Sequence, residues 1–314
     1  MSNLTSGYLL EEQEGADAST SRRGMLVLIA WWVTLLLSKL PLVIARDLVG
    51  TDIPWITSAW IGMAALLFAA TYIWQGIRPL RGYFLVIGVI WLLAGLDPFV
   101  RQTALWQNLF VGRGEMVALL GDRVLLVLQA FIVIAALFLI GAKKQDVFLE
   151  VGNLKAPVGG QASSHRRWFL SWSVVGTLTS ILLGGLFFAF LVSQDPEILS
   201  NPAAVLPWLP LILLSAALNA FGEEVTFRAA PLGALLPAVG PRHALWLTSL
   251  WFGLGHYYGG IPSGPVGLIQ SGLLAWLLGK AMLDTRGLGW SWIIHMVIDT
   301  AIYAYIALMT AAAL

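Results

Sequence analysis

Long apolar runs, separated by short polar connections, make up most of this 314-residue chain. A helix needs about 20 apolar residues to cross a bilayer, and only helices and closed barrels satisfy their backbone hydrogen bonds there. The runs are continuous and lack the alternation of barrel strands, so they favour helices. Only 11% of the residues are charged, against roughly 25% in soluble domains. We therefore predict an all-α fold, a polytopic bundle of membrane helices.

Nine apolar segments are candidate spans, which predicts eight or nine transmembrane helices. They lie at residues 25–45, 54–76, 82–100, 117–141, 168–192, 203–221, 243–258, 264–283 and 290–312. If the N-terminus is cytoplasmic, thirteen Lys and Arg residues fall in inside connections, Arg228 and Arg242 among them, and four in outside connections. This asymmetry fits the positive-inside rule. It predicts an integral, multi-pass protein of the cell membrane with a cytoplasmic N-terminus.

The polar segments divide the chain into four parts. Residues 1–24 are predicted to be a polar, disordered tail, and residues 25–141 hold the N-terminal transmembrane helices. Residues 142–167 are predicted to be a cytoplasmic linker, and residues 168–314 carry the charged motifs described below. A net charge of +1 argues against a nucleic-acid partner and leaves the lipid bilayer as the expected surroundings. The chain has no cysteine, which excludes disulfides, a thiolate nucleophile and Cys-ligated metals.

Two adjacent carboxylates and a guanidinium follow the apolar segment at 203–221. They are Glu223, Glu224 and Arg228. A charge inside a membrane helix costs at least about 2.5–3.5 kcal/mol at the centre, so such residues are functional candidates. Glu224 and Arg228 are i,i+4 neighbours on a helix and can pair, whereas Glu223 points about 100° away. We therefore expect Glu224 to be structural and Glu223 to be available for chemistry.

Two further helices carry ionisable groups in apolar surroundings. His256 follows Phe252 near the end of one segment, and His295 and Asp299 lie four residues apart in the last one. The spacing of four puts His295 and Asp299 on one helical face. Because charged groups in membrane helices face a bundle interior or a wet cavity, the three helices are predicted to converge there. Phe252 is most simply a packing or pocket-lining residue.

These groups are sufficient for hydrolysis. Burial and a nearby cation act in opposite directions on a carboxylate, so Glu223 can be poised to take a proton from water, with His256 sharing or relaying it. His295 and Asp299 can then hydrogen bond to the oxyanion that forms at a scissile carbonyl. The alternative is a non-catalytic membrane protein, either a proton-coupled transporter or a peptide-binding scaffold with the same Glu/His cavity. Transporters commonly consist of repeated halves, and no repeat is visible here.

The order of the three motifs resembles the CPBP intramembrane protease family, which includes type II CAAX prenyl endopeptidases and abortive-infection or bacteriocin-processing proteins. The motifs are Glu223-Glu224-x-x-x-Arg228, Phe252-x-x-x-His256 and His295-x-x-x-Asp299. The resemblance covers roughly residues 168–312 and implies that residues 168–314 form a CPBP-type intramembrane protease domain. It implies that Glu223 and His256 activate the water, that His295 and residue 299 form the oxyanion site, and that Glu224 and Arg228 hold the arrangement.

The last motif departs from the CAAX endopeptidases, which carry Asn where this chain has Asp299. An ionised Asp cannot donate a hydrogen bond, so Asp299 would be protonated, orient His295 or ligate a metal. Glu223, His256, His295 and Asp299 are a plausible ligand set for Zn²⁺ with an open position, and the family has been described as metalloproteases. A glutamate-activated water needs no metal, and we favour that reading. The expected substrate is a peptide or protein at the membrane.

Overall fold

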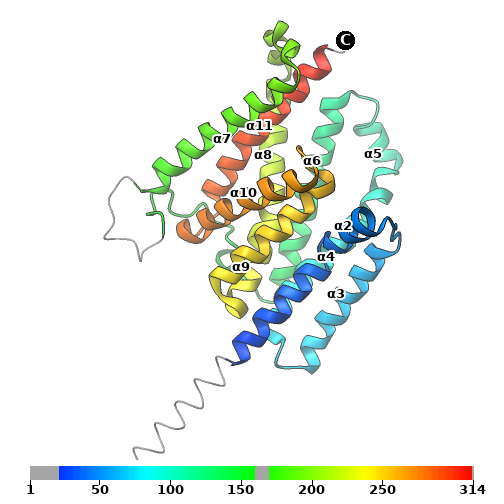
Figure 1. Ribbon diagram of the computed structural model, residues 1–314, viewed down its shortest axis with the longest axis vertical. Helices are drawn as coiled ribbons and strands as arrows, with labels where there is room; N and C mark the ends of the chain where they lie inside the picture. Colours follow the sequence, from blue (N-terminus) through cyan, green and yellow to red (C-terminus); the bar gives the residue numbers. More distant parts are fainter. Residues whose placement is uncertain (1–20, 160–169, 313–314) are drawn as a thin grey trace, which may run out of the picture.

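The computed structural model describes residues 21–159 and 170–312 (Figure 1). In these ranges the chain is helical, and its one β-type contact is an isolated bridge between Pro157 and Ser171. The predicted all-α class is therefore confirmed. Most of the predicted tail and the C-terminal part of the predicted linker lie outside the described residues.

The helices before the linker form a compact group on one side of the molecule. They are a first helix, Ser21–Leu36, then α2 (Leu40–Val43), η1 (Ile44–Val49), α3 (Ile56–Ile73), η2 (Arg78–Leu80), α4 (Arg81–Arg101), α5 (Ala104–Leu109) and α6 (Glu115–Leu139). The linker itself contains η3 (Lys144–Val147). The helices after it are α7 (Trp172–Gln194), η5 (Pro196–Ser200), η6 (Pro202–Trp208), α8 (Leu209–Glu223), η7 (Glu224–Ala229), α9 (Ala230–Gly259), α10 (Gly264–Thr285) and α11 (Gly289–Ala312).

Seven helices in the described residues are long and apolar enough to span a membrane, or eight if the bent pair Ser21–Leu36 and Leu40–Val49 is one span. Each of the nine predicted segments falls in one of these helices. The count is lower than nine because the segments at 203–221 and 243–258 belong to one continuous helical stretch of 58 residues, Pro202–Gly259. At 1.5 Å per residue this stretch is far longer than the ~30 Å hydrocarbon core, so it is more than one span.

The connection expected between those two segments, residues 222–242, is helical apart from Gly240. Glu223 is the last residue of α8, and helical residues continue through η7 into α9. The chain turns within α9 at Gly240, where φ is 78° and ψ is 168°. Only glycine adopts this conformation readily, since it has no Cβ. Arg228, counted above among the cations of the inside connections, is buried in η7 with 1% of its surface exposed.

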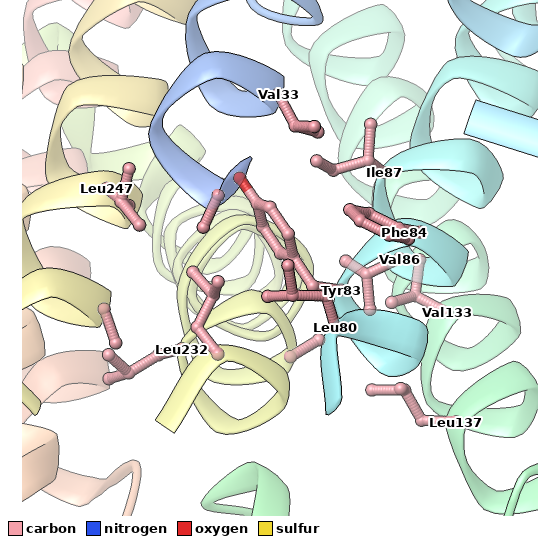
Figure 2. Close-up of a cluster of buried hydrophobic side chains, with 14 of the residues drawn as sticks. Val33, Leu80, Tyr83, Phe84, Val86, Ile87, Val133, Leu137, Leu232 and Leu247 are labelled. Carbon is pink, nitrogen blue, oxygen red and sulfur yellow. The ribbon is translucent and has the colours of Figure 1, made fainter. Parts of the chain in front are cut away.

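One hydrophobic core joins helices from both parts of the chain (Figure 2). Its side chains come from the first helix, η2, α4, α6 and α9, and include Val33, Leu80, Phe84, Ile87, Val133, Leu137, Leu232 and Leu247. The one polar group in this view, the Tyr83 hydroxyl, is paired, since its oxygen lies 2.5 Å from Thr34 Oγ1. The helices before residue 141 therefore pack directly on α9 and stabilise the part of the chain that carries the motifs.

The described part of the predicted linker also packs against that part of the chain. The Asn153 amide donates to the Thr285 carbonyl at 2.7 Å, and the Leu288 amide donates to the Glu150 carbonyl at 2.7 Å. The backbone of the linker at Asp146 also lies close to α9 at Gly233. A Cβ added to Gly233 would lie 2.1 Å from the Asp146 carbonyl oxygen. Residues 144–157 thus bind the turn between α10 and α11.

Candidate active site

A reversal of the chain at Gly240 brings the first two motifs together. Glu223 lies 17 residues before Gly240 and His256 lies 16 residues after it, so a straight helix would separate them by about 50 Å. Instead the two arms run side by side. Arg228 and Phe252 are each 12 residues from Gly240, and the guanidinium carbon of Arg228 lies 4.6 Å from the centre of the Phe252 ring.

The Glu224 carboxylate is fully buried and receives three hydrogen bonds. Arg228 donates to one oxygen, the Ser291 hydroxyl donates to the other, and His295 Nδ1 lies 2.7 Å from Oε1. Glu224 is 0% exposed, and the Arg228 side chain is 1% exposed. The predicted i,i+4 pair between Glu224 and Arg228 is therefore confirmed. With its oxygens fully engaged, Glu224 holds η7 against α11.

His295 lies between three carboxylates. Its Nδ1 faces Glu224, and its Nε2 lies 3.7 Å from both Glu223 Oε2 and Asp299 Oδ2. The predicted common face for His295 and Asp299 is therefore confirmed. Donation of Nδ1–H to Glu224 fixes the ring plane and leaves Nε2 as the nitrogen turned toward Glu223.

Asp299 is buried behind His295. Its Oδ2 accepts a hydrogen bond of 2.9 Å from Asn219 Nδ2, a side chain on α8. Asp299 and His295 are 4% and 5% exposed. Asp299 thus acts as an acceptor here, which suits a carboxylate.

Glu223 and His256 line one cavity of about 210 Å³, together with Phe227, Trp251, Phe252, Gly255 and Gly259. The Glu223 side chain is 17% exposed, so it is far more accessible than Glu224. His256 Nδ1 hydrogen bonds with the Phe252 carbonyl at 3.0 Å, which leaves Nε2 as the free ring nitrogen. A carboxylate and an imidazole therefore share one concave, mostly aromatic pocket.

The comparisons with known proteins bear on this pocket. Residues 204–301 match the family described as type II CAAX prenyl endopeptidase Rce1-like. No curated protein and no solved structure matches the chain. The resemblance derived from the three motifs is thus confirmed.

The matched region, residues 204–301, contains every site residue predicted from the sequence, from Glu223 to Asp299. The N-terminal helices, residues 25–141, lie outside the match. Its apolar helices indicate an integral, multi-pass membrane protein, and residues 204–301 match a protease family.

Phe252 lies between the two imidazoles of the site. Its ring centre lies 4.3 Å from that of His256 and 6.4 Å from that of His295, the second pair meeting edge to face. Phe227 packs against it from η7, with ring centres 6.4 Å apart. The predicted packing and pocket-lining role of Phe252 is confirmed.

Two polar residues of the site were not predicted. Asn219 and Ser291 are hydrogen-bond donors to Asp299 and Glu224, and both are buried. Each stands four residues before a predicted site residue, Asn219 before Glu223 and Ser291 before His295. That spacing of four places them on the same helical faces and could have identified them.

The proposed zinc ligands are not arranged as a metal site. Zinc ligands lie about 2.0–2.2 Å from the ion, and residues 21–159 and 170–312 contain no group of three or more His, Asp or Glu side chains that could hold a metal. These side chains do not fit a zinc ion as placed, so no step below uses one.

Proposed function

We propose that this protein is an intramembrane endopeptidase that hydrolyses a peptide bond of a membrane-associated or C-terminal peptide substrate. One observation carries the proposal: Glu223 and His256 line the same pocket, while the neighbouring Glu224 is consumed by internal hydrogen bonds. The type II CAAX prenyl endopeptidase family of residues 204–301 supports the same class of reaction.

In the proposed reaction, Glu223 accepts a proton from a water molecule as the water oxygen attacks the scissile carbonyl carbon. The carbonyl π bond breaks and its electron pair becomes the oxyanion of a tetrahedral intermediate. When this intermediate collapses, the C–N bond breaks and the leaving amine takes the proton, either from Glu223 or through His256 Nε2. The products are a new carboxylate and a new amine, and the enzyme returns to its starting protonation.

The buried half of the site supports this chemistry electrostatically. We assign His295 Nε2, which points toward Glu223, as the hydrogen-bond donor to the oxyanion when the ring carries both protons. Asp299, which accepts from Asn219 and lies 3.7 Å from Nε2, positions and stabilises that ring. Glu224 holds it from the other side. Removal of one oxyanion donor typically lowers the rate by about 10²–10³.

The test measures cleavage of quenched fluorescent peptides by purified protein in liposomes. Glu223→Gln, His256→Ala and His295→Ala are each expected to abolish cleavage while the protein stays folded. Glu197→Gln, the same change at an exposed glutamate, is the matched control and should keep full activity. Full activity in Glu223→Gln would show that the assigned base is wrong.

Two further measurements separate the alternatives. Proton flux without peptide cleavage in the same liposomes would favour a transporter, and peptide binding without either would favour a scaffold. Stoichiometric zinc by elemental analysis, together with loss of activity on chelation, would overturn the metal-free mechanism. We also propose a cytoplasmic N-terminus, from the distribution of Lys and Arg, and the cell membrane as the location.

A further inference from the structure

A second cavity, of about 230 Å³, adjoins the pocket that holds Glu223 and His256. The two share three lining residues, Phe227, Trp251 and Gly255. The second cavity is formed between the two parts of the chain. Its other walls are Ser38, Lys39, Ile90, Trp91, Leu93, Ala94, Gln129 and Thr226.

Lys39 is the cation of this cavity. It follows the first helix, where the chain bends toward α2, and its ammonium nitrogen lies 5.1 Å from the centre of the Trp91 ring and 5.8 Å from that of Trp60. Among the described residues, no carboxylate lies within 4.0 Å of it. A partly buried ammonium without a nearby anion can bind an anionic ligand, because folding has already removed part of its hydration and an anion replaces those lost interactions.

The buried hydroxyl of Thr226 is a second, independent observation that indicates a ligand in this cavity. It is 2% exposed, and its hydroxyl has no hydrogen-bond partner within the described residues. Buried hydroxyls normally have a partner, since an unsatisfied one costs about 1–3 kcal/mol. Thr226 lines the same cavity as Lys39 and follows Glu223 by three residues in the chain. A hydroxyl donor and an ammonium thus face one space beside the proposed catalytic pocket.

We propose that this second cavity binds a carboxylate of the peptide substrate, with Lys39 pairing with the carboxylate and Thr226 donating its hydroxyl. The proposal rests on the proposed endopeptidase function and names the part of the substrate that sets its position. The apolar walls formed by Ile90, Trp91 and Leu93 suit apolar side chains next to that carboxylate. The carboxylate is either the α-carboxylate at the C-terminus of the substrate or an Asp or Glu side chain.

The experiment measures binding in the Glu223→Gln variant, so that cleavage does not enter the result. Three pools of synthetic heptapeptides, each with three consecutive positions near the C-terminus randomised among apolar residues, are passed over the immobilised protein in detergent. One pool ends in a free carboxylate, one in a carboxamide, and one in a carboxamide preceded by Asp. We expect retention of a carboxylate pool to exceed that of the plain carboxamide pool by about 10- to 100-fold, the range of a charge-assisted hydrogen bond.

A second substitution assigns the preference to this cavity. Adding Lys39→Met, which keeps the length of the side chain, should remove the preference, and Thr226→Val should reduce it. Lys155→Met, the same change at an exposed lysine, is the control and should leave the preference intact. The free-acid and Asp pools identify the source of the carboxylate.

The outcomes separate the two proposals. Equal retention of the three pools, whether high or absent, overturns the carboxylate site, and so does a preference that survives Lys39→Met. Failure of the unsubstituted protein to cleave any peptide, with the Lys39-dependent preference present, overturns the endopeptidase function alone.

Discussion

Glu224→Ala tests whether the buried ion pair organises the site. The substitution leaves the Arg228 side chain, 1% exposed, without its carboxylate. Breaking a buried pair by removing one partner typically costs about 3–5 kcal/mol. Ser291 and His295 also lose their acceptor, and a buried donor left unsatisfied costs about 1–3 kcal/mol. We therefore expect Glu224→Ala to lower the free energy of unfolding by at least about 3–5 kcal/mol.

The double variant Glu224→Ala/Arg228→Met makes this test specific. Methionine removes the unpaired charge and keeps much of the volume, and replacement of both members of a buried pair by apolar residues is often close to neutral. The double variant should therefore be more stable than Glu224→Ala by about 2 kcal/mol or more. Cleavage should remain lost, because His295 Nδ1 still lacks the acceptor that orients the ring.

The assay is equilibrium unfolding by SDS in mixed micelles, followed by helix content, with peptide cleavage measured on the same samples. Asp52→Ala is the control: it breaks the exposed Arg46–Asp52 pair, whose side chains are 47% and 74% exposed, and such pairs contribute about 0–1 kcal/mol. A double variant less stable than Glu224→Ala would refute the reasoning, since the penalty could then not come from an unpaired Arg228.

Two more predictions concern the backbone and the topology. Gly240→Ala adds a Cβ in a conformation that only glycine adopts readily, so it should lower the free energy of unfolding by about 1–3 kcal/mol and lower cleavage. The control is Gly62→Ala, in α3 with open space around it, which should be neutral or slightly stabilising. Equal melting temperatures for the two variants would count against a strained turn. Because the chain has no cysteine, Arg113→Cys and Lys155→Cys each introduce a single site for labelling. A membrane-impermeant maleimide should reach Lys155→Cys only from the cytoplasmic side and Arg113→Cys only from the opposite side. The reverse pattern would show that the topology is inverted.

Much of the site follows from helical spacing within single segments. The contacts between Glu224 and Arg228, and between His295 and Asp299, are each set by an i,i+4 relationship on one helix. Such contacts are local, so they could be predicted before the helices were placed.

The features that sequence reasoning missed depend on how distant segments pack. A stretch with Pro237, Gly240, Pro241 and Arg242 resembles a polar loop, because Gly and Pro commonly end helices. In the structure this stretch stays helical apart from Gly240. The cavity wall around Lys39 could not be predicted either, because it forms only when the first helix and α4 pack beside α9.

The reversal at Gly240 also constrains how such a chain can change in length. Glu223 and His256 meet because 17 and 16 residues separate them from the turn, so each arm extends about 25 Å. Loss of one helical turn from a single arm would withdraw one of the two groups by about 5.4 Å, more than a hydrogen bond spans. Insertions and deletions on the two sides of Gly240 are therefore tolerable only when they compensate each other, a symmetry that genuine variants of this chain should obey.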